Sequence, residues 1–156
     1  MFQKKIIFLL FLLLSSCGYE AIYSKKNSSN YIFSISDLSF VGDRTVNLKI
    51  KEKLSTFTQN KKDKDLIIRI SSTSKKITIA KNTTGDATSF KNVVSINVDV
   101  LMDDKFNSNF TILESFNYNN ISNKFNLKRY EEEIINNLAE TASDKLIFKL
   151  SNIQWY

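Results

Sequence analysis

The sequence of 156 residues contains no histidine, no proline and a single cysteine. Without histidine, the chain cannot form a Ser-His-Asp triad or a Cys-His nucleophile pair. A lone thiol has no partner for an intramolecular disulfide and does not make a zinc site. The phosphate-binding loop and the dinucleotide-binding glycine fingerprint are also absent. These absences argue against an enzyme, and we expect neither a cofactor nor a bound metal.

The single cysteine, Cys17, ends a pattern typical of exported proteins. Lys4 and Lys5 precede an uninterrupted apolar run over residues 6–14, and two serines separate this run from the cysteine. The run is too short for a transmembrane helix and fits the apolar region of a secretory signal peptide. The Leu-Ser-Ser-Cys order looks like a bacterial lipobox, in which the cysteine sulfur receives a diacylglycerol and cleavage leaves an acylated N-terminus. The alternative is an ordinary signal peptide with an incidental cysteine.

We therefore predict a signal peptide over residues 1–16, an acylated Cys17 with a polar tether over residues 17–30, and a single α+β sandwich domain over residues 31–156. Acyl chains attach a protein to a membrane without crossing it. Gly18 follows the cysteine, in place of the aspartate that favours retention in the inner membrane. The expected location is therefore the periplasmic face of the outer membrane.

The charge balance says little about a partner. The chain carries 22 Lys and Arg against 16 Asp and Glu, a net charge of +6, and removal of Lys4 and Lys5 with the signal peptide leaves +4. The basic residues are scattered and no nucleic-acid-binding motif is present, so we expect no nucleic-acid partner. The remaining charge is compatible with an anionic lipid or glycolipid, although codon bias toward lysine and asparagine is the stronger explanation.

The first part of the predicted domain reads as a strand followed by a helix. Residues 31–40 begin with the alternation of a strand, and Gly42 breaks it. An amphipathic helix should follow, with Asp43 or Thr45 as its N-cap. Its predicted buried stripe consists of Val46, Ile50, Leu54 and Phe57.

The next strand, over residues 66–82, changes the parity of its apolar positions. Leu66, Ile68 and Ile70 share one face, whereas Ile77 and Ile79 occupy the other. A strand with period two cannot do this without a bulge, a bend or a change of partner between the two groups. The sequence Thr-Gly-Asp at 84–86 then predicts a hairpin turn into the following strand.

Two further strands follow the hairpin turn. Over residues 93–102 the alternation is the clearest in the chain and predicts one buried and one polar face. The predicted buried side chains are Val94, Ile96, Val98, Val100 and Met102, and the polar ones are Ser95, Asn97 and Asp99. The strand over residues 110–118 places Phe110, Ile112, Phe116 and Tyr118 on one face, with Glu114 as the exception.

A long helix ends the chain, roughly over residues 127–150, with Asn126 as the predicted N-cap. Acidic residues Glu131–Glu133 near its start and Lys145 and Lys149 near its end favour the helix dipole. The predicted buried stripe is Ile135, Leu138, Ala142, Leu146 and Leu150. The order β-α-β-β-β-α predicts an α+β fold: a four-stranded, mostly antiparallel sheet with two helices packed on one face.

This sequence resembles the LPS-assembly lipoprotein family, LptE. The residues that carry the resemblance are CGYEAIYS at the lipobox cysteine, VVSINVDVLMDDK and FTILESFNYN in the paired strands, and RYEEE with NNLAETASDKLIFKL in the terminal helix. The resemblance covers most of the mature chain. It implies a non-catalytic outer-membrane lipoprotein that plugs and helps assemble a β-barrel of the LptD type, and that contacts lipopolysaccharide during its delivery to the cell surface.

The resemblance also implies that basic residues near loop ends contact the glycolipid. Lys75, Lys76, Lys81 and Lys91 flank the predicted hairpin tip and are the candidates for binding lipid A phosphates. The competing interpretation is that these lysines protect a strand edge against unwanted pairing, which is a common use of lysine.

Two other functions remain open for an anchored domain of this kind. One is an auxiliary lipoprotein of an ABC-type lipid-transport system, which would bind periplasmic transport proteins. The other is a structural envelope lipoprotein without an obligate partner.

Overall fold

The computed structural model describes residues 32–59, 61–102 and 105–153. The predicted signal peptide, Cys17 and the tether lie outside these residues. The elements are β1 (Phe33–Gly42), α2 (Arg44–Leu54), the short 3-10 helix η2 (Ser55–Phe57), β2 (Lys64–Lys81), β3 (Ala87–Met102), β4 (Lys105–Asn119) and α3 (Lys124–Asn152). No helix in the described ranges combines the length and apolar character of a membrane span.

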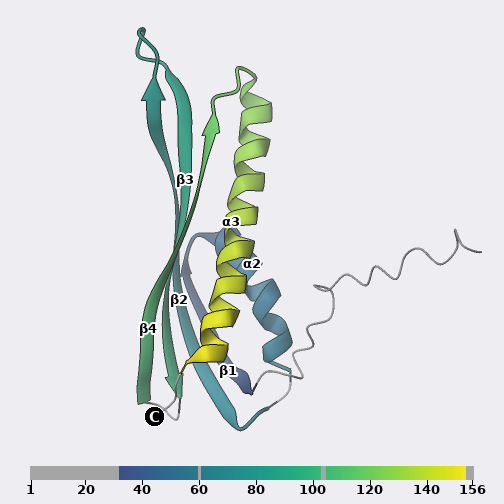
Figure 1. Cartoon of the computed structure of the whole chain (residues 1–156). Coiled ribbons are helices and arrows are strands. Elements are labelled where there is room, and N and C mark those ends of the chain that lie inside the picture. The colour runs from purple at the N-terminus through teal and green to yellow at the C-terminus, as the bar shows by residue number, and fades with distance from the viewer. Residues whose placement is uncertain (1–31, 60, 103–104, 154–156) are drawn as a thin grey trace, which may run out of the picture. The chain divides into compact units, whose positions relative to one another are not determined.

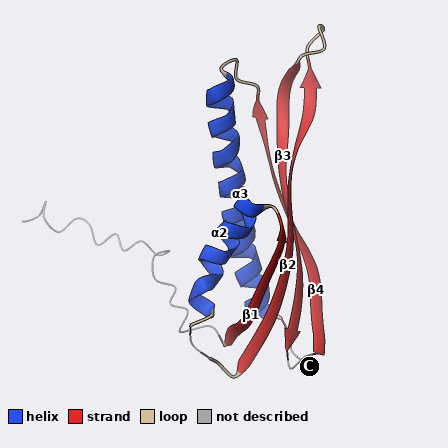
Figure 2. Cartoon of the chain, turned by 180° about the vertical axis from the view of Figure 1, so that it is seen from behind, coloured by secondary structure: helices blue, strands red, loops and turns tan. Residues whose placement is uncertain are grey.

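The four strands form one sheet in the order β1-β2-β3-β4, and both helices lie on the same face of it (Figures 1 and 2). The β1–β2 pair is parallel, with α2 in the connection, and the other two pairs are antiparallel. The predicted α+β fold is therefore confirmed. One face of the sheet carries the core, and we call the opposite face, away from α2 and α3, the open face.

The turn from β1 into α2 depends on Gly42 and Asp43. Gly42 has φ +103°, and a Cβ there would lie 1.9 Å from the backbone oxygen of Ser72 in β2. Only glycine fits such a close approach with a positive φ. Asp43 is the N-cap of α2, because its Oδ1 accepts a hydrogen bond from the Val46 amide at 3.1 Å. The predicted stripe Val46, Ile50, Leu54 and Phe57 is buried.

The parity change in β2 occurs where its pairing with β1 ends. The parallel β1–β2 ladder stops at Ser72, whereas β2 continues to Lys81 paired only with β3. No bulge interrupts the β2–β3 ladder before Thr78, and the loss of the β1 partner at Ser72 is the change that the structure shows in this segment. Beyond Ser72, Ile77 lies on the open face opposite Lys91, and Ile77 and Ile79 are each about half exposed.

The hairpin and β3 agree with their predicted patterns. β2 ends at Lys81 and β3 begins at Ala87, and Oδ1 of Asn82 accepts backbone bonds from Thr84 and Asp86 in the turn between them. The even-numbered apolar residues of β3 face the helices; Val94, Ile96, Val98 and Val100 are fully buried and Met102 is partly buried. Ser95, Asn97 and Asp99 lie on the open face, as expected.

Two side chains on the helix-facing side of β4, Phe116 and Glu114, are not part of the core. Ile112 and Tyr118 are buried, whereas 48% of Phe116 is exposed. Glu114, the exception in the sequence pattern, points to the same side, and its Oε1 is 2.5 Å from Nζ of Lys145 in α3. The charged residue is tolerated here because an ion pair satisfies it at the margin of the core.

The start of α3 differs from the prediction. The helix begins at Lys124 with Asn123 as its N-cap, and Asn126, predicted as the cap, donates its amide to Oδ1 of Asn123 at 3.0 Å. The first turn then contains no acidic residue, so the predicted dipole role of Glu131–Glu133 is wrong. The buried face also differs: Ile134 is buried, whereas Ile135 is only partly covered. The buried residues are Leu127, Ile134, Leu138, Ala139, Ala142, Ser143, Leu146 and Leu150.

Candidate binding surface

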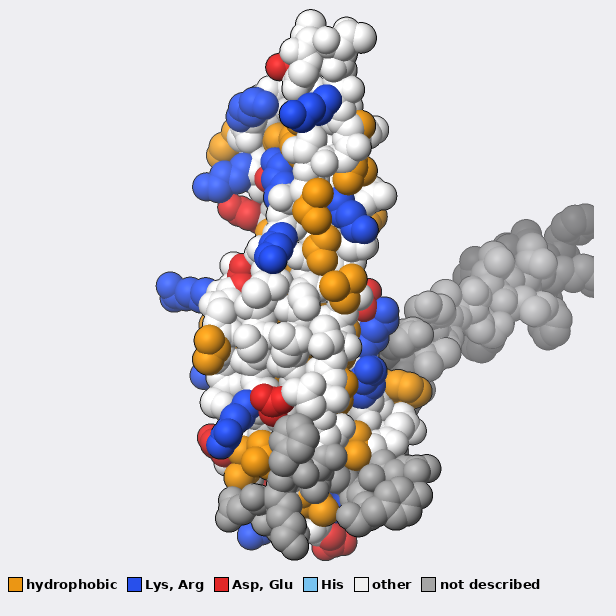
Figure 3. All heavy atoms as spheres, turned by 90° about the vertical axis from the view of Figure 1, so that its left-hand side faces the viewer, with side chains coloured by type: hydrophobic (Ala, Val, Ile, Leu, Met, Phe, Trp, Pro, Cys, Tyr) orange, Lys and Arg blue, Asp and Glu red, His pale blue; other side chains and the backbone are white. Residues whose placement is uncertain are grey.

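The middle of the open face is polar and uncharged. Ser71 of β2, Asn97 of β3 and Thr111 of β4 are direct neighbours across the three strands. The Thr111 hydroxyl donates to Oδ1 of Asn97 at 2.7 Å. Thr73 and Ser95 continue the polar surface in the next row, which Leu113 completes on β4. Figure 3 shows this part of the face as a band of uncharged polar side chains and backbone. Such groups exchange hydrogen bonds with a polar partner at little desolvation cost compared with charges.

An apolar stripe crosses the open face on the hairpin side of this band. It consists of Ile77 in β2, Val93 in β3 and Leu113 in β4, each offset by one row from the next. Leu113 is 62% exposed and Ile77 is 46% exposed. Figure 3 shows orange side chains in this upper part of the face, between blue lysine and arginine side chains. Clustered exposed apolar residues mark interaction sites more often than isolated ones do.

Lys75 and Lys91 lie beside this stripe. Lys75 is directly opposite Val93 in the β2–β3 ladder, and Lys91 is directly opposite Ile77. No ion pair involves either lysine in the described part of the chain. Two of the four predicted lysines therefore share one face with exposed apolar groups.

The other two predicted lysines lie elsewhere. The Nζ of Lys76 is on the helix side of the sheet, 2.5 Å from Oε1 of Glu131 and 3.9 Å from the centre of the Phe90 ring. Lys81 is exposed at the end of β2, next to the hairpin turn. The pleat of the strand thus separates Lys76 from its sequence neighbour Lys75, because successive side chains point to opposite faces.

A polar cluster fixes α3 to the hairpin beneath the stripe. The Tyr118 hydroxyl lies 2.9 Å from Oε1 of Glu131 and 3.2 Å from Oδ1 of Asn92. Burial raises the pKa of Tyr118, and the hydrogen bond to the Glu131 carboxylate raises it further. Lys76 donates to the same carboxylate. The cluster orders the helix-facing side of the hairpin, whose other side carries Lys75 and Lys91.

The sequence pattern did not identify the apolar stripe as part of a surface. Ile77 and Ile79 did give a signal, since their parity is opposite to that of the buried residues in the same strand. Val93 and Leu113 gave none, because each follows or precedes a buried apolar neighbour and reads as part of an apolar run. The stripe is formed across three strands, so it requires the register of the sheet.

Three solved lipoprotein structures are similar to this chain. Rare lipoprotein B from Shewanella oneidensis has a TM-score of 0.59 at 14% identity, covering 73% of this chain and 92% of that one. A minor lipoprotein from Acinetobacter baumannii has a TM-score of 0.57 at 9% identity, covering 78% and 91%. Uncharacterized lipoprotein B from Nitrosomonas europaea has a TM-score of 0.52 at 16% identity, covering 76% and 83%.

These similarities show that the chain shares the fold of the three lipoproteins over most of their length. No protein-family model and no curated protein sequence matches the chain. The fold expected from the sequence pattern is therefore found in three proteins described as lipoproteins.

Proposed function

We propose that this chain is a non-catalytic outer-membrane lipoprotein that plugs and helps assemble a β-barrel of the LptD type and contacts lipopolysaccharide during its delivery to the cell surface. Cys17 provides the acyl anchor at the periplasmic face. The observation that carries the proposal is the one-sided covering of the sheet: α2 and α3 bury one face, and the open face presents uncharged hydrogen-bonding groups to a partner. The resemblance in sequence and the lipoprotein fold support it.

The mechanism for the barrel partner is steric and uses hydrogen bonds. The lumen of an outer-membrane barrel is lined by polar side chains. A rigid insert for such a lumen needs polar, largely uncharged surface, because buried charges without partners are costly. The Ser71–Asn97–Thr111 row, with Thr73 and Ser95 beside it, meets that requirement.

The mechanism for the glycolipid combines charge and apolar contact. The ammonium groups of Lys75 and Lys91 would form charge-assisted hydrogen bonds with lipid A phosphates. Ile77, Val93 and Leu113 lie between and beside them and would contact acyl chains. Lys81, exposed beside the hairpin turn, extends the basic surface. Lys76 contributes less, because Glu131 already neutralises it.

Purification of the acylated protein from its native envelope in mild detergent tests the barrel partner. We expect a stoichiometric outer-membrane barrel of the LptD type, identified by mass. Asn97→Arg places a charge in the middle of the open face and should abolish this association. Leu48→Arg is the matched control, since Leu48 is exposed on α2 at the other side of the sheet, and it should leave the association unchanged.

The same purification separates the competing functions. Recovery with a periplasmic lipid-transport complex would favour the auxiliary transport lipoprotein. Recovery alone would favour the structural lipoprotein. Either result would refute the plug.

A further inference from the structure

β4 is a long edge strand, and its inner side pairs regularly with β3. β4 is the last strand in the sheet order, and its ladder with β3 runs from Ser108 to Asn119 without a register shift. In the described part of the chain, no strand pairs with its outer side. Half of the backbone N–H and C=O groups of such an edge point outward and form a template for another strand.

The other exposed edges of this sheet carry the usual protection. β1 has a bulge between Ile35 and Asp37, and Asp37 is a charged, exposed residue on that edge. The part of β2 beyond Ser72, where β1 pairing has ended, carries lysines at 75, 76 and 81. Bulges and lysines are the devices by which proteins prevent edge pairing.

β4 lacks these devices. Between Ser108 and Asn119 it has no lysine, no proline and no bulge. Its single charged residue in this range, Glu114, is paired with Lys145 of α3. This difference from the two protected edges indicates that the edge of β4 is available to pair with another strand.

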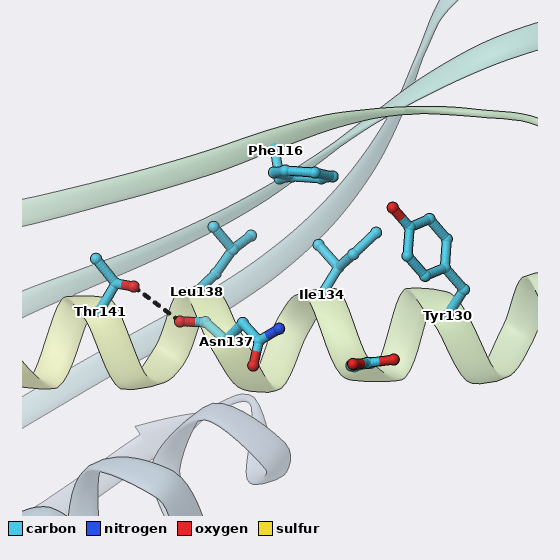
Figure 4. Close-up of a pocket in the computed structure, with 7 residues that line it drawn as sticks. Phe116, Tyr130, Ile134, Asn137, Leu138 and Thr141 are labelled. Carbon is cyan, nitrogen blue, oxygen red and sulfur yellow. Dashed lines mark hydrogen bonds between the residues drawn. The ribbon is translucent and has the colours of Figure 1, made fainter. Parts of the chain in front are cut away.

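An apolar groove runs beside this edge, between β4 and α3. It has a volume of about 250 Å³ and is lined by Phe116 of β4 and by residues of α3 that include Tyr130, Ile134 and Leu138. Figure 4 shows Phe116 above the helix, with Ile134 and Leu138 directed toward it. Phe116 is 48% exposed, although it lies on the helix-facing side of the strand. Alternate side chains of a strand added to β4 would fall on this same side, over the groove.

One acidic residue, Glu133, lies at the rim of the groove. Glu133 lines the apolar groove and also the adjoining surface hollow formed with Arg129 and Glu132. Glu133 has no ion pair among the described residues. A second copy of this chain would not supply a cation from β4, because residues 108–119 contain no basic residue. The charge therefore favours a different polypeptide.

We propose that the free edge of β4 binds an extended segment of a partner protein as a fifth strand, with an apolar side chain in the Phe116 groove and a basic side chain beside Glu133. Backbone bonds along the edge would supply affinity, and the groove and carboxylate would supply specificity. This binding site does not depend on the proposed function, because it uses an edge and a helix side that the open face does not include.

A designed peptide tests the edge directly, since backbone pairing accepts any strand of suitable length. The probe is an acetylated and amidated peptide of about ten residues. It alternates threonine with isoleucine or leucine, and a lysine lies two positions from the central leucine. The full-length acylated protein in detergent micelles is mixed with this peptide, and hydrogen exchange is measured for the amides of Ser108–Asn119. We expect exchange to slow by about tenfold or more at saturation.

Two variants test the groove and its rim. Phe116→Ala should weaken peptide binding about tenfold, whereas Asn117→Ala, on the open face of the same strand, should leave it unchanged. Both side chains are solvent-exposed, so both variants keep the fold. Glu133→Gln should weaken peptide binding about twofold to fivefold, as expected for an exposed ion pair. The same variant should bind a peptide with norleucine in place of lysine as well as the wild type does.

Two results would overturn the proposal. Unchanged exchange in β4 at millimolar peptide would show that the edge does not accept a strand. Protection of β4 without peptide, together with a dimer in size-exclusion chromatography, would assign the edge to a second copy. Neither result depends on the barrel partner. Failure of the peptide experiment therefore leaves the proposed function standing, and failure to recover a barrel would not affect the peptide result.

Discussion

The Tyr118 hydroxyl of β4 donates to the Glu131 carboxylate of α3 at 2.9 Å, and this bond joins the hairpin to the helix that covers it. Lys76 binds the same carboxylate from β2, so three elements meet at one charged group. Most of the sheet is held to α3 by apolar contact. This end is held by polar contact, which is directional and orders the side chains around it.

Removal of the Tyr118 hydroxyl should destabilise the protein. Tyr118→Phe removes the hydrogen bond to Glu131 and the 3.2 Å contact with Oδ1 of the buried Asn92, whose Nδ2 has no partner among the described residues. We expect a loss of about 1 to 3 kcal/mol in the free energy of unfolding, measured in urea. Tyr130→Phe is the control, since Tyr130 is exposed, and it should change the free energy by less than about 0.5 kcal/mol. Equal effects of the two substitutions would contradict the role of the cluster.

The same tyrosine predicts a loss of stability in alkali. Burial and the Glu131 carboxylate raise the pKa of Tyr118 above its ordinary value near 10 in the folded state. The unfolded chain therefore releases this proton first, and the contribution of Tyr118 to stability is complete below about pH 10 and falls as pH rises above it. The free energy of unfolding should decrease more steeply between about pH 9 and 11 in the wild type than in Tyr118→Phe. Parallel curves would contradict this assignment.

The sequence predicts best where one face of a strand is buried. Val94, Ile96, Val98 and Val100 alternate with polar residues because β3 is central in the sheet and covered on one side only. The N-cap of α3 was predicted at Asn126 and lies at Asn123. Each asparagine precedes a polar stretch, and either can cap a helix. Local chemistry alone does not separate such alternatives.

The candidate surface was predicted only in part, for a different physical reason. Lys75 and Lys76 are equivalent in the sequence, but the pleat places one beside the apolar stripe and the other beside Glu131. The stripe itself requires the cross-strand register of Ile77, Val93 and Leu113. Register depends on long-range pairing, which a pattern within one strand does not contain.

The two glycines with positive φ should differ in their response to alanine. At Gly42 a Cβ would lie 1.9 Å from the Ser72 oxygen, whereas at Gly85 nothing lies within 4 Å. Gly85→Ala should cost about 1 kcal/mol for the backbone conformation alone. Gly42→Ala must in addition move β1 from β2, and we expect a loss of more than about 3 kcal/mol. Urea unfolding of both variants checks this, and a small effect at Gly42 would show that the β1–α2 turn relaxes freely.

Asp43 should stabilise the protein above acidic pH. Burial alone would raise the pKa of this carboxyl, but hydrogen bonds from the Ser74 hydroxyl and from the amides of Val46 and Thr45 lower it overall. Its contribution is therefore present above the ordinary pKa of 3.8 and is lost as pH falls through the lower folded value. Asp43→Ala should cost about 0.5 to 2 kcal/mol at neutral pH, and the cost should shrink in acid. Asp63→Ala, which removes an exposed aspartate between η2 and β2, is the control and should change the free energy of unfolding by less than about 0.5 kcal/mol at neutral pH.

Glycolipid binding should separate into a salt-dependent part and a salt-independent part. Replacement of Lys75 and Lys91 by serine removes two cations, so the affinity for purified lipopolysaccharide should fall at low salt and lose most of its dependence on salt between about 50 and 300 mM. The control is the same exchange at Lys51 and Lys128, which are exposed on α2 and α3 and remove the same net charge.

Leu113→Ser tests the apolar part of the same surface. It should lower the affinity by a similar factor at every salt concentration, because apolar burial is not screened by ions. If the Lys51 and Lys128 variant loses as much affinity as the Lys75 and Lys91 variant, the attraction comes from net charge alone. The stripe and its two lysines would then be no binding site for the glycolipid, and protection of the β2 edge would remain as the role of Lys75.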